Sequence, residues 1–484
     1  MKFLNHYYRP LLIVILAFAF FTRVARLSQP NTYIFDEVYH AITAKLIARN
    51  DHRAYEWWNP PVEPNTSVDW LHPPLAKYTQ AASMLVFGEN SFGWRFSSAL
   101  FGVGVIWATA YLSLILFKNK PLSLLAALLA SLDGLLLVQS RIAMNDIHVT
   151  FLILLTAIMY RLFRDSQSQL QLNKWLWLTG LSAGLAMGTK WSGLFILIFV
   201  WMYELWSLVT SHAQFKKKMK FFLQRLVVLG VLPLIIYILS YSHMFLQGKT
   251  LVCLSDRVQQ GKCYYEELPV AGHTFRFYAS HFYELHRQIW WYQTHLTATH
   301  SYQSRPWQWF FDLRPVWMYV KYEDADHIGN IYSQGNPLLF WTGDVALIAS
   351  LGGLAGISLL AFKRRSLSKT QLKKIKPAWT QYEPVLFVLL AYSIVWIPWQ
   401  LSPRIMFFYH YTPAVPFLCI NLAFWLHQLF SPATKQDRLL SQSLAWTTLL
   451  IIALTFVLFY PNWTGIVVSK SFMNRVYFAV ESWH

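Results

Sequence analysis

Long apolar stretches separated by short polar segments dominate the chain. Runs of about 20 apolar residues, the length that crosses a bilayer, begin near residues 10, 92, 121, 146, 174, 191, 222, 337, 382, 404 and 441. They predict an all-α polytopic membrane protein with about eleven transmembrane helices. The helices predicted at 174–190 and 191–210 are both short and share a tight turn from Gly188 to Ser192.

Two segments, 29–91 and 248–336, are too long to be simple connectors. Loops of more than about 15 residues usually carry function. In the first segment, Pro73 and Pro74 can open a short helix that runs to about Gly88 and is expected to lie along the membrane surface. The chain is therefore expected to form one membrane domain, 1–484, with two long extracytoplasmic loops.

The basic residues predict the orientation of this domain. Short connections carry basic runs such as Lys216–Lys218 and Lys363–Arg365 directly beyond apolar stretches, and such runs mark the cytoplasmic side. The N-terminus is then cytoplasmic, and the C-terminus and both long segments lie outside. The same distribution explains the net charge of +18, so no nucleic-acid partner is expected.

Composition excludes several other classes of protein. Charged residues make up 13% of the chain, about half of their usual share in soluble proteins, which rules out an ordinary soluble enzyme. Three cysteines are too few for a disulfide framework, although Cys253 and Cys263 share the second long segment and could pair in an oxidising compartment. The chain has no Gly-rich nucleotide loop and no Walker motif, so a nucleotide-dependent enzyme is not expected.

Two adjacent carboxylates, Asp36 and Glu37, follow the first apolar run by only a few residues. A charge near the bilayer is costly unless it has a partner or a function. A carboxylate there can act as a general base towards a hydroxyl group. A solvated acidic pair at the start of a helix explains the same pattern equally well.

Four isolated cations, Arg95, Arg141, Lys190 and Arg404, adjoin apolar runs on the outer side, where basic residues are disfavoured. One such residue would be an interfacial anchor, but four at one level indicate an anionic ligand, and the arginine fork suits phosphate. Further candidate contacts to this anion are His72 and Lys77 around the two prolines, and His410 and Tyr411, the latter seven residues after Arg404 and so expected on the same helix face.

The end of the second long segment is dense in hydrogen-bonding and flat aromatic side chains, which suits the recognition of a sugar or a peptide. A packed interfacial loop is the alternative. The candidate acceptor or sugar contacts are Asp146, His300, Tyr302, Gln303, Ser304, Arg305 and Trp307.

Taken together and in this order, the motifs resemble those of the protein O-mannosyltransferases. The likeness runs through Asp36-Glu37, His72-Pro73-Pro74-Leu75-Ala76-Lys77, Gly93-Trp94-Arg95, Leu132-Asp133-Gly134, Ser140-Arg141-Ile142, the stretch from Gly188 to Phe195, and the run from Phe407 to Tyr411. The resemblance implies a GT-C fold, a polyprenyl-phosphate mannose donor, and the Ser or Thr hydroxyls of translocated proteins as acceptors. It also implies that Asp36 is the base of an inverting reaction and that Glu37 orients Asp36 or the acceptor.

The chain lacks the soluble β-trefoil insert of the eukaryotic members of that family. This absence favours a bacterial enzyme of the inner membrane, with its active site on the extracytoplasmic face, and leaves acceptor choice open. No cofactor is required on this account and no divalent metal is expected, although two carboxylates could hold one. The alternatives are a lipid-carrier-dependent glycosyltransferase that acts on a lipid or cell-wall glycan, and a transporter. A transporter fits less well, because transporters place their polar residues at the membrane midplane.

Overall fold

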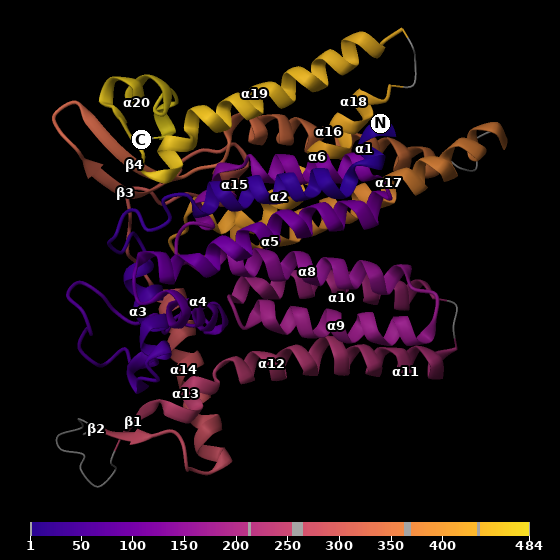
Figure 1. Ribbon diagram of the computed structural model, residues 1–484. Coiled ribbons are helices and arrows are strands. Elements are labelled where there is room, and N and C mark those ends of the chain that lie inside the picture. The colour runs from indigo at the N-terminus through magenta and orange to yellow at the C-terminus, as the bar shows by residue number, and fades with distance from the viewer. Residues whose placement is uncertain (1, 212–213, 254–264, 363–368, 433–435, 484) are drawn as a thin grey trace.

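A bundle of roughly parallel and antiparallel helices forms the body of the protein, as the computed structural model shows (Figure 1). The structure describes all residues except 1, 212–213, 254–264, 363–368, 433–435 and 484. The bundle contains α2 (Tyr8–Val24), α5 (Ser91–Phe117), α6 (Lys120–Ser131), α7 (Gly134–Gln139), α8 (Asp146–Asp165), α9 (Gln169–Met187), α10 (Leu194–Thr210), α11 (Phe215–Leu226), α12 (Leu232–Ser240), α16 (Pro337–Phe362), α17 (Lys369–Trp396), α18 (Val415–Phe430) and α19 (Arg438–Thr464).

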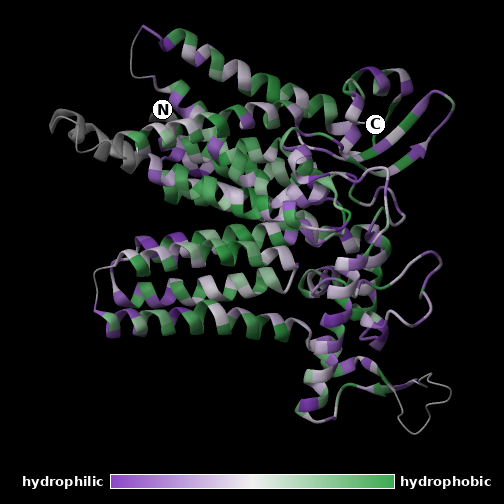
Figure 2. Cartoon of the chain, turned by 180° about the vertical axis from the view of Figure 1, so that it is seen from behind, coloured by the Kyte–Doolittle hydropathy of each residue, from purple (hydrophilic) through white to green (hydrophobic). Residues whose placement is uncertain are grey.

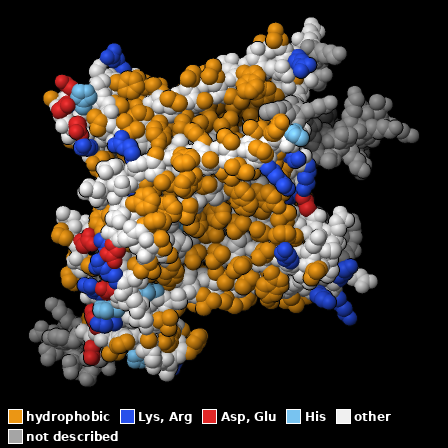
Figure 3. Space-filling model, in the orientation of Figure 1, with side chains coloured by type: hydrophobic (Ala, Val, Ile, Leu, Met, Phe, Trp, Pro, Cys, Tyr) orange, Lys and Arg blue, Asp and Glu red, His pale blue; other side chains and the backbone are white. Residues whose placement is uncertain are grey.

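The helices of this bundle have the lengths and compositions of membrane spans. Within the described residues, eight helical segments are long and apolar enough to cross a membrane, so the chain is an integral membrane protein. The three other predicted spans coincide with α2, α6 and α9, and the count of eleven stays a prediction. Hydrophobic side chains form a broad band across the middle of the molecule, with charged side chains gathered at both ends (Figure 3).

The two long segments lie together at one end of the bundle, at the left in Figure 1, and this end is called the loop end below. The N-terminus lies near the opposite end and the C-terminus at the loop end. Seen from behind, hydrophilic residues gather in the loops and connections, and hydrophobic residues cover the helices (Figure 2). This arrangement agrees with the predicted topology. Cys263, the possible partner of Cys253, and the basic run Lys363–Arg365 fall outside the described residues.

The first long segment forms α3 (Glu37–Ala48), a 3-10 turn η1 (His52–Tyr55) and α4 (Leu75–Phe87). α4 begins directly after Pro74 and ends at Gly88, whose positive φ of 86° stops the helix. The short helix predicted from the two prolines is therefore confirmed. Leu85 and Val86 in its last turn are exposed, as a helix at the membrane surface requires, and that location stays a prediction.

The second long segment contains strands that the apolar pattern did not predict. Its helices are α13 (Ser242–Gln247), α14 (Phe275–His295) and α15 (Pro306–Phe310). Strands β1 (Lys249–Cys253) and β2 (Tyr265–Pro269) pair antiparallel, and β3 (Val316–Tyr322) pairs with β4 (His327–Ser333). β5 (Val467–Ser469) adds to β4 from the C-terminal tail, which ends in α20 (Lys470–Val476). These strands are short and lack a regular alternation, so periodicity alone could not reveal them.

The segment around Arg404 departs from its prediction. The sequence predicts a helix that begins at Arg404 and carries Tyr411 on the same face, and this prediction is wrong. Residues 402–407 are not helical, a 3-10 helix η7 spans Phe408–Ala414, and α18 begins only at Val415. Pro413 has no amide N–H, and its ring clashes with the carbonyl four residues earlier, which disfavours an α-helix through this segment.

Candidate active site

A cavity of about 380 Å³ opens at the loop end of the bundle, within the range of small-ligand sites. Six parts of the chain line it: the start of α3, residues 67–72, residues 144–146 at the start of α8, the turn between α9 and α10, residues 292–300 at and after the end of α14, and the segment 404–410. Helices that end at the same level thus bring together residues that are hundreds of positions apart in sequence. This cavity is called the catalytic cavity below.

Asp36 enters the catalytic cavity from the position before the first residue of α3. Phe35 has a positive φ of 49°, an uncommon conformation for an aromatic residue, and this turn leads the backbone directly into α3. The Tyr409 hydroxyl donates to Asp36 Oδ2 at 3.4 Å. Burial raises the pKa of the Asp36 carboxyl, as do the nearby Asp69 and Asp146, whereas His40 and Lys190 oppose this shift. A carboxyl with a raised pKa is a stronger base than an ordinary aspartate.

Glu37 lies next to Asp36 in sequence but has a different environment. Its side chain is fully buried and forms a two-pronged ion pair with Arg95, with Nε–Oε1 and NH2–Oε2 distances of 2.8 and 2.7 Å. It also accepts the backbone N–H groups of Ile34 and Ala143 at 3.1 and 2.9 Å. Glu37 therefore fastens the start of α3 to α5 and to the loop before α8. It positions Asp36 and does not line the cavity.

Two of the four isolated cations are occupied by structural contacts. Arg95 bonds the carbonyl oxygens of Leu27, Pro30 and Thr32 in addition to Glu37. Arg141 bonds the carbonyl oxygens of residues 22, 23, 25 and 26, the last carbonyls of α2 and the turn after it, where a helix end attracts cations. Neither side chain lines the catalytic cavity. Their placement gives no support to the predicted role in binding the donor phosphate.

Lys190 and Asp146 form a buried pair inside the catalytic cavity. Lys190 Nζ lies 2.7 Å from Asp146 Oδ1, and it also sits over the ring of Tyr409, 5.5 Å from the ring centroid. Asp146 is the first residue of α8, so the helix dipole favours its negative charge. The pair keeps a cation close to Asp36, and Asp146 balances its formal charge.

Arg404 is the cation of the cavity that is most available to an anion. Its guanidinium bonds the Gln293 side chain and the Ile405 carbonyl, and among the residues that the structure describes it forms no ion pair with a carboxylate. Arg404 also lines a second, larger cavity of about 960 Å³ beside the first. It therefore stands at the junction between the two cavities.

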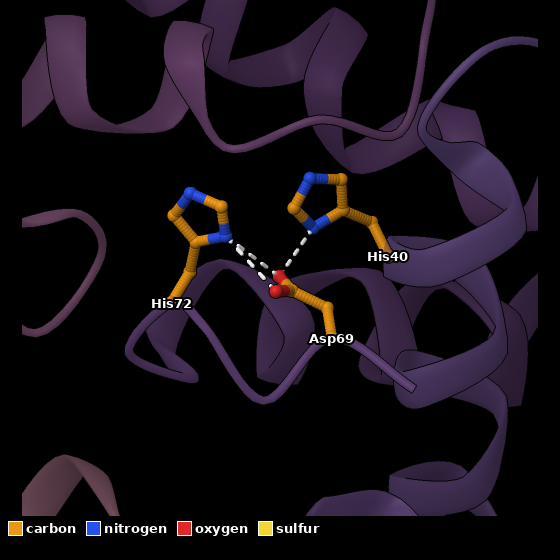
Figure 4. A group of neighbouring side chains, drawn as sticks. All are labelled: His40, Asp69 and His72. Atoms are coloured by element: carbon orange, nitrogen blue, oxygen red, sulfur yellow. Dashed lines mark hydrogen bonds and ion pairs between the residues drawn. The ribbon is translucent and has the colours of Figure 1, made fainter. Parts of the chain in front are cut away.

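A buried carboxylate that the sequence did not single out, Asp69, binds two histidines that line the catalytic cavity (Figure 4). His40 Nδ1 lies 2.8 Å from Asp69 Oδ2, His72 Nδ1 lies 2.9 Å from Oδ1, and Lys77 Nζ lies 2.8 Å from Oδ2. Burial alone would raise the pKa of Asp69, but His72, Lys77 and His40 hold it well below its usual range. The Lys77 side chain is fully buried against this carboxylate, so its ammonium group does not reach the membrane surface.

The three side chains of His40, Asp69 and His72 have potential ligand atoms within 4.8 Å of one another, close enough to share a metal ion. Lys77 already supplies a positive charge to the same carboxylate oxygen that faces His40. A divalent cation would have to compete with this ammonium group. The expectation that no metal is needed stays a prediction.

The predicted acceptor contacts divide between the two cavities. His300 is exposed and lines the catalytic cavity, whereas Gln303, Ser304, Arg305 and Trp307 line the larger one. Ser304 accepts the indole N–H of Trp309 at 2.8 Å. Tyr302 lines neither cavity and packs against Trp317 and Tyr332.

The last two candidates lie in η7. His410 lines the catalytic cavity and stacks on Trp309, and its Nδ1 donates to the Phe407 carbonyl oxygen at 2.9 Å. Tyr411 is buried in the core and bonds the Tyr392 hydroxyl, so it does not reach the cavity.

The sequence did not indicate three residues of the site, Asp69, His40 and Tyr409. For His40, its spacing of four residues from Asp36 was a usable signal.

Two family models match the chain. The model described as dolichyl-phosphate-mannose-protein mannosyltransferase covers residues 13–246, and the model described as the C-terminal four TMM region of protein-O-mannosyltransferase covers residues 278–483. Together they span most of the sequence. The chain belongs to the protein O-mannosyltransferase family.

Curated relatives and a solved structure extend over nearly the whole chain. The polyprenol-phosphate-mannose–protein mannosyltransferases of Corynebacterium glutamicum and Mycolicibacterium smegmatis are each 26% identical, covering 94% and 95% of this chain and 90% of each relative. The Saccharomyces cerevisiae protein O-mannosyltransferase Pmt1-Pmt2 complex bound to the sugar donor matches with a TM-score of 0.74 at 16% identity, over 95% of this chain and 90% of that one. The predicted helical GT-C fold is confirmed by this likeness.

In this member of the protein O-mannosyltransferase family, both matched regions build the catalytic cavity. Asp36, Asp69 and Lys190 come from the region of the first model, whereas Arg404 and Tyr409 come from the second. Within the described residues, three carboxylates, Asp36, Asp69 and Asp146, line the cavity together with two cations, Lys190 and Arg404. Lys77 does not line the cavity but pairs with Asp69 from behind, and with it the formal charges at the cavity cancel before any substrate enters.

Proposed function

We propose that this protein transfers mannose from polyprenyl-phosphate mannose to Ser or Thr hydroxyls of other proteins. The observation that carries the proposal is the catalytic cavity, where a carboxylate with a raised pKa lies together with an arginine that forms no ion pair with any described carboxylate. The first residue can accept a proton, and the second can bind a phosphate. The donor and the acceptor class are those in the names of the relatives from Corynebacterium glutamicum and Mycolicibacterium smegmatis.

In the proposed reaction Asp36 accepts the proton of the acceptor hydroxyl. The hydroxyl oxygen forms a bond to the anomeric carbon as the bond from that carbon to the phosphate oxygen breaks, and the electron pair remains on the phosphate. Attack on the face opposite the leaving group inverts the anomeric configuration. Arg404 and Lys190 stabilise the charge that develops on the leaving phosphate.

We propose that the reaction takes place on the extracytoplasmic face of a bacterial inner membrane. The short connections rich in Lys and Arg mark the other end of the bundle as cytoplasmic. A polyprenyl tail can then remain among the membrane helices while its phosphate reaches Arg404. The larger cavity next to Arg404 leaves room for an acceptor polypeptide.

Transfer by the purified protein tests the proposed function directly. The protein would be given radiolabelled polyprenyl-phosphate mannose with a peptide rich in Ser and Thr, with the same peptide carrying Ala at those positions, or with lipid acceptors. We expect label in the Ser/Thr peptide alone. Label in a lipid acceptor and none in the peptide would replace the proposal by the lipid-modifying alternative.

The pH dependence of transfer should show the ionisation of Asp36. Only the carboxylate form can accept a proton, so activity is lost as the pH falls through the pKa of Asp36. Because that pKa is raised, we expect the acidic limb of log kcat/KM to lie above the ordinary aspartate value of about 3.9. Asp69 has a depressed pKa and titrates below this limb. The pKa of His72 is about 4, close to the limb, so variants of Asp36 are needed to distinguish the two groups. A limb that stays in place in Asp36→Glu and Asp36→Asn variants would assign it to another group.

Replacing Arg404 should weaken binding of the lipid carrier. A hydrogen bond to a charged group contributes about 1.5–3 kcal/mol, so we expect Arg404→Ala to raise the Kd for polyprenyl phosphate by about 10–100-fold. Arg404→Lys should recover only part of the affinity, because the two-pronged geometry is lost. Arg287→Ala, on the exposed side of α14, is the matched control. Unchanged carrier binding by Arg404→Ala would make Arg404 an interfacial anchor and Lys190 the phosphate ligand.

A further inference from the structure

Asp69 holds two imidazole rings at the wall of the catalytic cavity and has no direct role in the proton or phosphate steps proposed above. Asp69 Oδ1 also accepts the Leu71 N–H at 3.2 Å, and the Asp69 N–H donates to the Thr43 hydroxyl at 2.7 Å. The carboxylate is thus fixed from both sides by backbone contacts as well as by His40, His72 and Lys77. So rigid an arrangement points to a function in placing the two rings.

The contacts with Asp69 determine which ring nitrogens carry hydrogen. An ionised carboxylate is an acceptor only, so the His72 Nδ1 that bonds both of its oxygens must carry the proton. The His40 Nδ1 lies 2.8 Å from Asp69 Oδ2 without the geometry of a hydrogen bond, and at that distance a nitrogen that carries hydrogen is favoured, because two lone pairs would repel each other. In a neutral ring the other nitrogen, Nε2, is then a hydrogen-bond acceptor. Figure 4 shows both rings with Nδ1 turned to Asp69 and Nε2 turned away from it.

Charge balance around Asp69 favours neutral rings. The buried Lys77 ammonium already compensates the carboxylate, so a second positive charge in the same place would be unpaired. Burial also lowers the pKa of His72 to about 4 despite the adjacent carboxylate. A neutral His72 cannot attract a phosphate as a cation would, which argues against the phosphate-binding role expected for it from sequence.

We infer that Asp69 is a positioning residue that presents the Nε2 atoms of His40 and His72 as acceptors for hydroxyl groups of the transferred sugar. This inference rests on the proposed function and names the part of the cavity that recognises the mannosyl group. His40 is one helical turn beyond Asp36 on α3, so the two share a helix face. With the anomeric carbon near Asp36 and the phosphate at Arg404, the sugar ring lies in the same cavity as both imidazoles.

Other acceptors in the cavity are less available to sugar hydroxyls. Asp146 is paired with Lys190, and Asp69 is paired with Lys77, whereas Asp36 is reserved for the acceptor hydroxyl. A pyranose carries several hydroxyl donors that must be satisfied when water is displaced. The two Nε2 atoms provide uncharged acceptors for them at the cavity wall.

Deoxy analogues of the donor test this inference. The parent protein and the variants His72→Phe, His72→Gln and Asp69→Asn would be compared on polyprenyl-phosphate mannose and on its 2-, 3-, 4- and 6-deoxy forms. We expect the parent to lose about 10-fold in kcat/KM on at least one deoxy donor. His72→Phe should lose a similar factor on the complete donor and show no further loss on that analogue, because the contact is already absent.

The two other variants separate positioning from folding. His72→Gln, which keeps an oxygen near the place of Nε2, should retain part of the preference, and Asp69→Asn should lose it without touching the sugar. Binding of polyprenyl phosphate without sugar should be unchanged in both His72 variants, whereas a general folding defect would reduce it. His281→Phe, at a buried histidine of α14 outside the cavity, is the matched control and should behave as the parent.

Three results would overturn the inference. One is that the parent and His72→Phe lose the same factor in kcat/KM on every deoxy donor, relative to the complete donor, while the parent transfers mannose normally. Another is loss of transfer on treatment with a chelator and recovery with added zinc or manganese, which would make His40, Asp69 and His72 metal ligands. A parent inactive with the mannosyl donor would overturn the proposed function and this inference together, so the two failures are distinguishable.

Discussion

Substituting asparagine for Asp36 is expected to slow mannosyl transfer by about 10²–10⁴-fold, the usual cost of losing a general base. The amide has nearly the same shape and can still contact the Tyr409 hydroxyl, but it cannot take up a proton. Binding of polyprenyl phosphate, assigned to Arg404 and Lys190, should remain close to that of the parent. Turnover with a fixed peptide acceptor and carrier binding would be measured on the same detergent-purified samples.

Asp51→Asn is the matched control for this experiment. Asp51 lies in the same long segment, pairs with Arg53 and does not line the catalytic cavity. We expect it to transfer mannose at the parental rate. Near-parental turnover by Asp36→Asn would show that another group removes the proton, and a loss of carrier binding in proportion to turnover would show that the substitution disturbs the whole cavity.

Removal of the Arg95 guanidinium is expected to destabilise the protein by about 3–5 kcal/mol, because it leaves the Glu37 carboxylate buried without a cation. Both side chains of this pair are almost completely inaccessible. Arg95 also bonds three carbonyl oxygens of the loop after α2, so Arg95→Ala should loosen the turn that carries Asp36. Thermal unfolding in detergent would measure the loss.

A surface ion pair of the same composition provides the comparison. Arg49 and Glu89 join the ends of α3 and α4, with an Nε–Oε1 distance of 2.8 Å, and remain partly exposed. Arg49→Ala should cost only about 0–1 kcal/mol. Equal effects of Arg49→Ala and Arg95→Ala would contradict the structural role of the buried pair and return Arg95 to the candidates for phosphate binding.

The positions of the helices could be predicted well from the sequence, because apolar runs report membrane spans directly. Apart from the run that begins near 404, each predicted run coincides with a helix, and α4 follows from its two prolines and Gly88. Predictions failed where local chemistry overrides the apolar pattern. Pro413 forces a 3-10 helix before α18, and β5 pairs with a strand more than a hundred residues earlier, which no local signal can report.

The sequence predicted the level in the membrane at which the candidate site lies, but not which side chains face the cavity. The scarcity of outer cations indicated correctly that Arg95, Arg141, Lys190 and Arg404 are unusual, yet it could not distinguish a cation that faces a cavity from one that binds carbonyl oxygens. The adjacent residues Asp36 and Glu37 have different environments that the sequence could not predict, because side chains next to each other at a helix start point to different sides. No pattern in the sequence indicated Asp69, because its partners come together only in the folded chain.

The balanced charges of the catalytic cavity have a consequence for the release of the spent carrier. The donor phosphate is a diester with a single negative charge, and bond cleavage turns it into a monoester that carries close to two at neutral pH. In the proposed step Asp36 is neutralised at the same moment, so negative charge moves from α3 towards Arg404 and Lys190. These cations then attract the departing lipid more strongly than the arriving one. From this distribution of charge we therefore expect polyprenyl phosphate to inhibit the enzyme as a product. The inhibition should be relieved when Asp36 loses its proton to solvent.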